Sequence, residues 1–433
     1  MELPKGWAFT TVGEIAQYIN GRAFKPQEWE EKGLPIIRIQ NLNNDKIKYN
    51  YTTKIYEDKY KVEYGDLLFA WSASLGAYIW RSSDAWLNQH IFKVIPFEGV
   101  DRKFMFYVLT NTVEHFYSKT HGSGMVHITK SIFEDTQILL PPFPEQQRIV
   151  EKIDALFSEL DKGVEILQIV KEQLKTYRQS VLNQGFEGNE EETKTTLSEI
   201  AEIVGGITKG RNLSNHETVS LPYLRVANVQ DGYLDLSTVK EIELKKDEVE
   251  KYILHVDDVL YTEGGDKDKL GRGTIWKGEI LNCVHQNHIF RARINSHKAI
   301  PKYVALYSRT RKAKSYFFSK AKQTVNLASI NMTVLKSLPI SLPPKEKQIE
   351  IISDIDIKLS YCDKLEQLVD ENLAKADALR QSILKKAFEG RLVPQDPNDE
   401  PAEMLLERIK AERAAAEQRM KQQKSLKRSK KNG

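Results

Sequence analysis

One long segment of this chain occurs twice, and the repeat constrains the fold more than any other feature. Residues 140–188 align without a gap with residues 342–390. Both copies begin with the tripeptide Leu-Pro-Pro, contain no proline beyond their first few residues, and end with the tripeptide Phe-Glu-Gly. The repeat divides the chain into two equivalent blocks, each a globular sequence followed by a long proline-free segment.

The repeated segment has the apolar period of a coiled coil. Apolar residues recur at alternating spacings of three and four over several heptads, which predicts a long helix that pairs along a narrow seam. A helix of some 40 residues would be about 60 Å long, because each residue adds about 1.5 Å. The predicted seam residues are Ile149, Ile153, Leu156, Leu160, Leu167, Val170, Leu174 and Val181 in the first copy, and Ile351, Ile355, Leu365, Val369, Leu379 and Ile383 in the second.

The two copies are suitable partners for each other. We expect them to fold back into an antiparallel coiled coil within one chain, although pairing between chains would also bury the seam. Lys358 and Asn372 fall on the seam of the second copy, where polar residues can fix the register. In an alternative arrangement Leu359, Leu368 and Leu373 make the contact, and both polar side chains turn outward.

Composition narrows the class of protein and its compartment. Of the 433 residues, 40% are hydrophobic and 29% are charged, which is typical of globular domains. We find no apolar run long enough for a transmembrane helix and no signal peptide at the start. Cys283 and Cys362 are the only cysteines, so we expect a reducing cytoplasm and neither disulfides nor a cysteine-based zinc site.

The two globular blocks share one pattern of short strands. In the first block, β-rich runs begin near residues 35, 66 and 90 and precede a predicted helix over residues 102–119. The second block repeats these runs near residues 222, 258 and 287. We therefore predict an α+β fold with two similar globular domains, joined by two long helices and related by a pseudo-twofold internal repeat.

The predicted boundaries follow from the repeat. They are a first globular domain at 1–140, a first long helix at 141–188, a second globular domain at 189–341, a second long helix at 342–390, and a C-terminal helix with a basic tail at 391–433. Within these, residues 189–194 are predicted to form an acidic linker and residues 402–423 a charged helix.

Charge is distributed unevenly along the chain. The net charge is +4, but residues 421–433 carry six basic residues and no acidic one, so without that tail the net charge is −2. Residues 280–345 contain no Asp or Glu but many Lys and Arg, interleaved with aromatic residues. A segment with only positive charges favours binding to the negatively charged backbone of a nucleic acid. A solvated basic face is the alternative.

Polar and basic side chains near the ends of the predicted strands are candidates for reading base edges. In the first block they are Arg22, Arg38, Gln40, Asn41, Ser72, Ser74, Asn88, Gln89, Ser123 and His127. In the second block they are Lys209, Arg211, Arg225, Asn228, Lys267, Lys269, Arg272, Gln286, Asn287, Lys320, Lys322, Gln323 and Asn326. Each of these side chains could instead cap a turn or support the fold.

The sequence shows little sign of catalysis. Residues 205–210 lack the Gly-x4-Gly-Lys-Ser/Thr spacing of a phosphate-binding loop, and no Asp/Asn-Pro-Pro-aromatic motif of an amino-methyltransferase is present. His285 and His288 lie near Cys283, but no second ligand pair accompanies them, so we predict no metal site.

The architecture resembles the specificity subunit of type I DNA restriction-modification enzymes. The resemblance rests on the Leu-Pro-Pro helix entries, the Arg-Gln-Ser-Val-Leu and Phe-Glu-Gly helix ends, the opening residues 3–7 and the terminal residues 394–413. The second helix departs from the pattern where Lys347 and Ile349 replace Glu145 and Gln147. This difference bears on local partner contacts.

The resemblance implies a non-catalytic subunit that binds double-stranded DNA. Each globular domain would be a target-recognition domain that reads one half of a bipartite target, and the coiled coil would set the unread spacer. Two modification subunits, which use S-adenosylmethionine to methylate adenine N6, would dock on the repeated helices. Restriction subunits would add ATP- and Mg-dependent translocation and cleavage, and this chain would need no cofactor of its own.

The sequence is also compatible with other functions. The chain could belong to a system that only methylates, or to another two-part restriction system. An enzyme with its own active site predicts activity from the isolated chain. A coiled-coil adaptor that binds only proteins predicts no salt-sensitive DNA binding.

Overall fold

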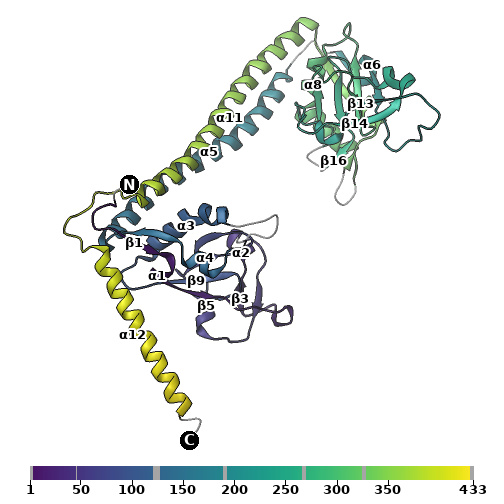
Figure 1. Cartoon of the computed structure of the whole chain (residues 1–433). Helices are drawn as coiled ribbons and strands as arrows, with labels where there is room; N and C mark the ends of the chain where they lie inside the picture. Colours follow the sequence, from purple (N-terminus) through teal and green to yellow (C-terminus); the bar gives the residue numbers. More distant parts are fainter. Residues whose placement is uncertain are drawn as a thin grey trace. The chain divides into compact units, whose positions relative to one another are not determined.

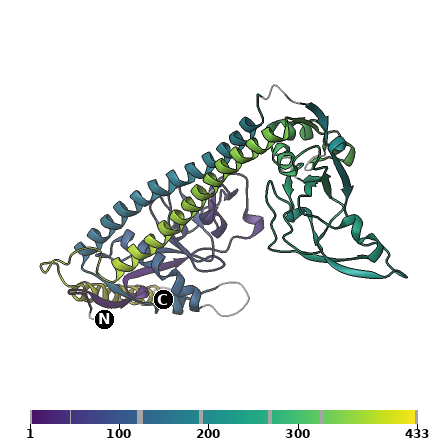
Figure 2. The same ribbon diagram turned by 90° about the horizontal axis from the view of Figure 1, so that it is seen from above.

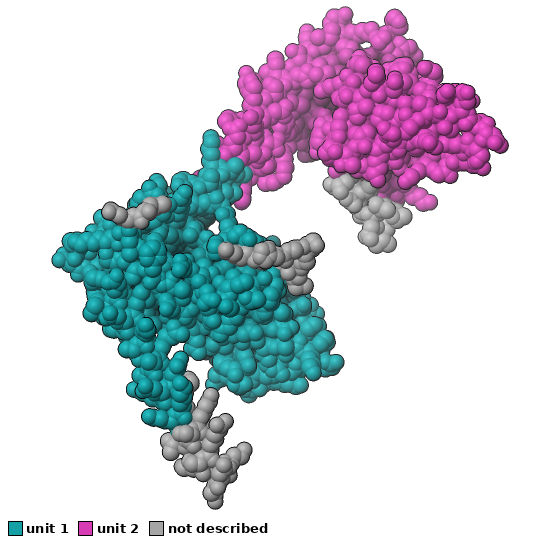
Figure 3. Space-filling model, viewed as in Figure 1, with its two compact units in different colours: residues 1–165, 373–433 teal, residues 166–372 magenta. Residues whose placement is uncertain are grey.

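The computed structural model of the chain describes residues 3–44, 46–119, 127–188, 193–265, 270–323 and 328–429. The chain divides into unit 1, residues 1–165 with 373–433, and unit 2, residues 166–372 (Figure 3). Each long helix passes from one unit into the other. Each unit is therefore one globular block together with part of both long helices, and unit 1 also includes the C-terminal segment that follows the second long helix.

In unit 1, the described residues form three sheets (Figure 1). The strand orders are β2-β9-β6-β7, β4-β3-β8-β5 and β1-β10. The strands are β1 (Ala8–Thr11), β2 (Ala16–Asn20), β3 (Leu34–Ile37), β4 (Asn50–Thr52), β5 (Lys61–Val62), β6 (Leu67–Ala70), β7 (Gly76–Ile79), β8 (Ala85–Leu87), β9 (Ile91–Pro96) and β10 (Gln137–Leu140). The short helices are α1 (Val12–Ile15), η1 (Pro26–Glu28), α2 (Ile39–Asn43), η2 (Asp58–Tyr60) and α4 (Lys130–Glu134), beside the longer α3 (Arg102–Lys119).

Among its described residues, unit 2 has an equivalent four-stranded sheet and an equivalent two-stranded sheet, and its other two sheets have three strands each. Its described strands form sheets β12-β19-β15-β17, β14-β13-β18, β11-β22 and β16-β21-β20. They are β11 (Thr193–Thr196), β12 (Ala201–Gly205), β13 (Thr218–Leu224), β14 (Lys240–Lys245), β15 (Val259–Thr262), β16 (Gly264–Gly265), β17 (Gly273–Ile275), β18 (Val284–His285), β19 (Ile289–Ile294), β20 (Lys322–Gln323), β21 (Ala328–Ser329) and β22 (Pro339–Leu342). The helices are α6 (Leu197–Ile200), η3 (Val226–Asn228), η4 (Lys246–Glu248), α7 (Val249–Tyr252), α8 (Pro301–Ser308), α9 (Arg311–Lys320) and α10 (Met332–Lys336).

Corresponding strands form the core of each unit. All residues of β6 and of β15 are buried, and each strand is paired on both sides, by β9 and β7 or by β19 and β17. Strands buried on both faces are expected to be continuously apolar, as the sequence 67–70 is. Strands β3 and β8, and likewise β13 and β18, pair in parallel, so each unit contains a mixed sheet. The predicted α+β fold and helix 102–119 are confirmed.

The two long helices, α5 (Phe143–Gly185) and α11 (Lys345–Phe388), run antiparallel and side by side (Figures 1 and 2). In unit 2, Lys171 pairs with Asp370 at 2.6 Å, whereas Arg178, further along α5, pairs with the earlier α11 residue Asp363 at 2.7 Å. In unit 1, Arg380 pairs with Asp161. Rising numbers on α5 thus meet falling numbers on α11, and pairing within one chain is confirmed.

Part of the predicted seam is wrong. On α11 the buried heptad positions are Ile355, Cys362, Val369, Ala376 and Ile383. Leu365 and Leu379 expose 49% and 48% of their surface, so neither lies in the seam. The second line of contact instead follows Leu359 and Leu373, which are partly buried. A heptad period fixes the spacing of a stripe but not which flank of that stripe faces the partner.

The two polar residues predicted on this seam, Lys358 and Asn372, make their hydrogen bonds within their own helix. Asn372 is exposed and donates to the backbone oxygen of Leu368 on its own helix, while Lys358 pairs with Asp354, also on its own helix. The alternative arrangement is therefore correct for Leu359, Leu373 and Asn372, but Leu368 is 52% exposed. Of the other predicted seam residues, Leu156, Leu160, Leu167 and Val170 are partly buried, and Ile149, Ile153, Leu174, Val181, Ile351 and Ile355 are buried.

Residues repeated in both helices attach each helix to its globular block. Gln146 accepts from the Asp101 backbone N–H at 2.9 Å and donates to the Pro141 oxygen at 3.0 Å. Gln348 makes the same bonds, with the Ile300 N–H at 3.0 Å and the Pro343 oxygen at 2.9 Å. Both glutamines are fully buried, so the structure explains their recurrence by the fold rather than by function.

The segments around the helices differ in detail from the predicted ones. Strand β11 begins at Thr193, so the end of the predicted linker belongs to a sheet. The C-terminal helix α12 (Ala402–Ser429) is longer than predicted. Its first turns pack on the first globular block through buried Leu405 and Ile409, and the rest of the helix extends beyond that block (Figure 1).

Candidate nucleic-acid interface

Several strand ends of unit 1 meet along one edge. Strand β9 runs antiparallel to β2 and β6, so the ends of β2 and β6 lie beside the start of β9. Backbone bonds join the following segments: Gln89 N–H to the Arg22 oxygen at 2.8 Å, Asn88 N–H to the Ile37 oxygen at 3.2 Å, and Trp71 N–H to the His90 oxygen at 3.1 Å. We call residues 20–22, 37–41, 71–74, 88–90 and 127 the strand-end edge of unit 1.

Unit 2 has the same edge with the same backbone bonds. Asn287 N–H donates to the Ile207 oxygen at 3.0 Å, Gln286 N–H to the Leu224 oxygen at 2.9 Å, and Glu263 N–H to the His288 oxygen at 2.9 Å. The strand-end edge of unit 2 comprises residues 205–211, 224–228, 263–264, 286–288, 322–323 and 329. The two edges are equivalent scaffolds, and the side chains on them can differ freely.

A glycine makes each edge possible. A Cβ atom on Gly21 would lie 2.0 Å from the Asn88 oxygen, and one on Gly206 would lie 2.1 Å from the His285 oxygen. Real Cβ atoms do not approach backbone oxygens so closely. Any other residue at either position would push the strand-end segments apart.

Trp71 forms the centre of the unit 1 edge. Its indole N–H donates to Asn20 Oδ1 at 3.0 Å, and its ring lies 4.9 Å from that of His90, 5.0 Å from that of His127 and 5.6 Å from that of Phe92, between centroids. The residues predicted from the sequence include neither Trp71, whose side chain is mainly apolar, nor Asn20. The available signal was their position at strand ends, since Asn20 is the last residue of β2 and Trp71 directly follows β6.

Three of the predicted base-reading residues serve the fold instead. Asn41 and Asn228 are each 3% exposed, and each accepts the N–H of the residue three positions earlier while donating to a backbone oxygen further on. These bonds hold the turn after β3 and after β13. Ser72 is also 3% exposed. The structure contradicts base contacts by these three side chains, because they are buried.

The predicted arginines are oriented by partners within the chain. Arg22 pairs with Glu28 at 2.8 Å and lies 4.2 Å from the Tyr56 ring, and Arg211 pairs with Glu248 at 2.9 Å. The Arg22 guanidinium lowers the pKa of Glu28 to about 2. The remaining predicted arginines contact neutral groups rather than carboxylates. Arg272 donates to Gln230 at 2.5 Å, Arg225 donates to the Thr238 oxygen at 3.0 Å, and Arg38 lies 5.5 Å from the Trp29 ring.

The other predicted residues remain candidates for DNA contact. Gln40, Gln89, His127, Lys209, Lys320 and Lys322 are exposed, and Ser74, Asn88, Gln286 and Asn287 are partly exposed. The Oδ1 atom of Asn88 is buried and has no hydrogen-bond partner within the described structure. Ser123, Lys267, Lys269 and Asn326 lie outside the described residues, and Gln323 is described only as part of strand β20.

The acid-free stretch 280–345 is not one uniform basic field. Arg291 is 2% exposed, and Arg293 forms a bidentate pair with Asp258 at 2.8 Å. Arg309 and Lys314 both pair with Asp231, and Lys302 pairs with Asp356. Acids from elsewhere in the sequence therefore neutralise much of this charge. The remaining exposed cations include Arg311, Lys312, Lys320, Lys322 and Lys336.

His285 is a core residue beside this edge. Its Nδ1 lies 2.9 Å from the Ile289 oxygen, and its ring is buried. Burial lowers the pKa of His285 to about 4. Among the described residues there is no group of three or more potential metal-ligating side chains.

This histidine should make unit 2 sensitive to acid. The unfolded state, with a pKa of about 6.5, binds the proton more readily than the folded state, so stability falls as the pH drops from about 6.5 to about 4. We expect the wild type to lose about 3 kcal/mol more unfolding free energy than His285→Asn between pH 7 and pH 4, measured by urea denaturation. The control His297→Asn changes an exposed histidine and should follow the wild type. If the unfolding free energies of the wild type and His285→Asn fell equally between pH 7 and pH 4, the lowered pKa of His285 would be contradicted.

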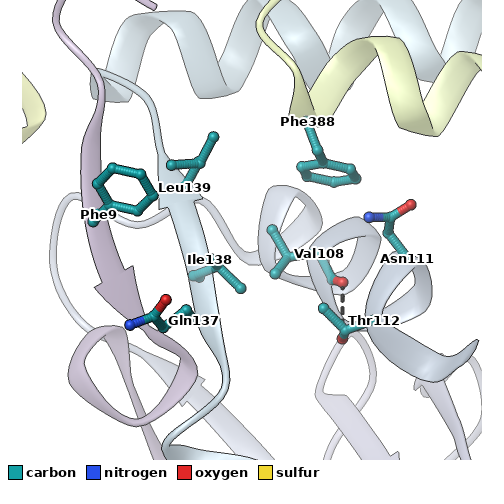
Figure 4. A pocket seen from close by; sticks show the side chains of 8 residues that line it. All are labelled: Phe9, Val108, Asn111, Thr112, Gln137, Ile138, Leu139 and Phe388. Atoms are coloured by element: carbon teal, nitrogen blue, oxygen red, sulfur yellow. Dashed lines mark hydrogen bonds between the residues drawn. The ribbon is translucent and has the colours of Figure 1, made fainter. Parts of the chain in front are cut away.

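A pocket of about 320 Å³ lies elsewhere on unit 1 (Figure 4). Phe388, at the end of α11, faces α3 and β10 across it, and the lining residues are Phe9, Val108, Asn111, Thr112, Gln137, Ile138, Leu139 and Phe388. The equivalent position of unit 2 has a pocket of about 560 Å³ formed by Phe186, Tyr307, Arg311 and their neighbours. The pocket in unit 1 is mainly apolar, which suits a protein side chain better than a phosphate.

In the described part of the chain, no helix is both long and apolar enough to cross a bilayer.

Comparison with known families decides what kind of chain this is. The type I restriction modification DNA specificity domain matches it twice, over residues 4–172 and 189–372. The chain belongs to this family. The two matched regions correspond to the two blocks found from the internal repeat, each with a strand-end edge.

Individual relatives agree with this membership. The EcoKI specificity subunit of Escherichia coli (strain K12) is 27% identical, with 96% of this chain and 97% of that protein aligned. The StySPI specificity subunit of Salmonella potsdam is also 27% identical, over 96% and 97% of the two chains. Both are named as specificity subunits of type I restriction enzymes, which agrees with the prediction of a non-catalytic subunit.

Solved structures share the fold. A chain from a study of complex assembly and conformational transition of the type I restriction-modification system superposes with a TM-score of 0.67, at 19% identity, over 90% of this chain and all of that one. The HsdS subunit from Thermoanaerobacter tengcongensis gives a TM-score of 0.53 at 18% identity, over 90% and 98% of the two chains.

Proposed function

We propose that this chain is the DNA-reading specificity subunit of a type I restriction-modification complex. The observation that carries the proposal is the pair of equivalent strand-end edges in a chain of the DNA specificity family. The backbone bonds of the two edges match, but the side chains on them differ. Such a chain would read one half of an asymmetric DNA target with each unit.

The long helices would have two tasks. As a paired rod, they would set the number of unread base pairs between the two half-sites. As a repeated surface, they would bind two modification subunits, which supply S-adenosylmethionine-dependent methylation of adenine N6. Restriction subunits would add ATP- and Mg-dependent translocation and cleavage, and the whole assembly would act on DNA in the cytoplasm. This chain would bring no cofactor of its own.

DNA binding tests the proposal directly. The full chain, co-purified with its modification subunits, should bind selected duplexes with an affinity that falls as salt rises. The double variant Lys320→Ala/Lys322→Ala removes two exposed cations, Lys322 in the unit 2 edge and Lys320 at the end of α9 two residues before it, so it should reduce the slope of log affinity against log salt by about 2.

A matched variant separates this effect from general charge loss. Lys194→Ala removes an exposed cation from β11, on the side of unit 2 where β12 begins rather than where it ends. Its salt slope should equal that of the wild type. The proposal fails if no duplex sequence is preferred, or if the isolated chain itself methylates or cleaves DNA.

A further inference from the structure

Glu263 of unit 2 occupies the position of Trp71 in unit 1. Each is the first residue after the central buried strand, β15 or β6. The N–H of each donates to a histidine oxygen, Glu263 to His288 at 2.9 Å and Trp71 to His90 at 3.1 Å. The oxygen of each accepts from an isoleucine, Ile330 at 2.8 Å and Ile128 at 3.1 Å. The two side chains therefore leave the same point of the same scaffold.

The Trp71 and Glu263 side chains would make different kinds of contact with DNA. The only polar hydrogen of the Trp71 side chain is already donated to Asn20 Oδ1, so the ring presents an apolar surface. The Glu263 carboxylate can only accept hydrogen bonds when ionised. The same position thus carries a stacking or methyl-contacting group in unit 1 and an acceptor in unit 2.

A short chain of hydrogen bonds holds Glu263 in place. Its Oε2 lies 2.5 Å from His288 Nδ1, and the other ring nitrogen, Nε2, lies 3.4 Å from Asn287 Nδ2. An amide nitrogen can only donate, so Asn287 Nδ2 donates to His288 Nε2. The proton of the neutral ring is then on Nδ1, and this N–H donates to Glu263 Oε2. The other carboxylate oxygen, Oε1, bonds no other described residue, and the side chains of Glu263 and His288 are 33% and 54% exposed. An oriented acceptor is therefore open to solvent on this edge.

A carboxylate on a DNA-facing edge is repelled by phosphates, so it needs a donor on the ligand. In the major groove the donors are exocyclic amino groups, and the one that pairs best with a Glu carboxylate is N4 of cytosine. We propose that Glu263 selects a cytosine in the half-site read by unit 2, with His288 and Asn287 as positioning residues. This inference rests on the proposed function and deepens it.

Selection from a random library tests the inference. The full chain with its modification subunits is incubated with duplexes of randomised central sequence, and the bound fraction is sequenced. The wild type should select two half-sites, one with an invariant cytosine that depends on Glu263. Glu263→Gln, which has the same shape and adds a donor, should lower discrimination at that one base pair by about tenfold or more. His288→Ala should weaken the same preference without creating another.

Two comparisons make the outcome decisive. Glu243→Gln neutralises another exposed acid, on β14 of unit 2, and should leave both half-sites unchanged. The half-site read by unit 1 must also stay unchanged in Glu263→Gln, which shows that the variant is folded and assembled. An unaltered cytosine preference in Glu263→Gln, or an effect on the other half-site, overturns the inference alone. A wild type that selects no sequence overturns the proposed function as well.

Discussion

Removing one heptad from each long helix is expected to shorten the unread spacer of the DNA target by about three base pairs. Seven helical residues span about 10 Å, and stacked base pairs are about 3.4 Å apart. The heptads to remove are residues 164–170 and 371–377, which lie between the ion pairs Asp161–Arg380 and Lys171–Asp370. Seven residues are close to two full helical turns. The residues of both ion pairs and of the buried stripe therefore stay on the same side of each helix after the deletion.

The effect on affinity should be large. A target with the original spacer can then engage only one unit at a time, so binding should fall about a thousandfold or more, towards the non-specific level. Library selection should recover both half-sites with the same bases but a shorter gap. The control keeps the length and changes two exposed residues of the same heptads, Gln168→Ala and Lys375→Ala. A deletion variant that still prefers the original gap would show that the helices do not set the spacer.

Removal of the Arg293 side chain should destabilise unit 2 by about 3–5 kcal/mol, because it leaves a buried carboxylate without its partner. Asp258 is 1% exposed and receives two hydrogen bonds of 2.8 Å from Arg293. The nearest other guanidinium, that of Arg291, lies 4.0 Å away and can offset only part of the loss. Urea denaturation of Arg293→Ala against the wild type measures the difference.

Two further variants identify the cause. Asp258→Asn removes the buried charge and keeps an acceptor for the His255 N–H, which bonds Asp258 at 2.8 Å. The double variant Arg293→Ala/Asp258→Asn should therefore recover most of the lost stability. Arg311→Ala removes an exposed arginine from the same acid-free stretch and should change stability by no more than about 0.5 kcal/mol. Equal losses in the single and double variants would mean that packing rather than charge explains the effect.

Local patterns predicted the elements of this fold well. The ends of α3 coincide with the predicted helix, and α5 and α11 lie within the predicted long segments. These features depend on apolar period and on proline and glycine positions, which are properties of neighbouring residues. The strand-end segments were also located correctly, because a strand must end where the apolar run ends.

Side-chain roles at those strand ends were harder to predict. Asn41 and Asn88 are both polar amides at strand ends, yet Asn41 Oδ1 accepts the Arg38 N–H and holds a turn, while Asn88 Oδ1 is buried without a partner among the described residues. Asn and Asp side chains bond local backbone and distant ligands with the same atoms. Only the positions of the surrounding backbone groups separate the two uses.

The sequence by itself determined the repeat, the two long helices, the α+β blocks and the family resemblance, because each is carried by the identity and spacing of nearby residues. The tertiary structure decided which flank of the heptad stripe is buried, which cations of 280–345 meet an acid, and which side chains face out from the strand-end edges. These outcomes depend on contacts between residues far apart in sequence, such as Arg293 with Asp258 and Glu263 with His288. No local pattern encodes such pairs, since the fold alone brings them together.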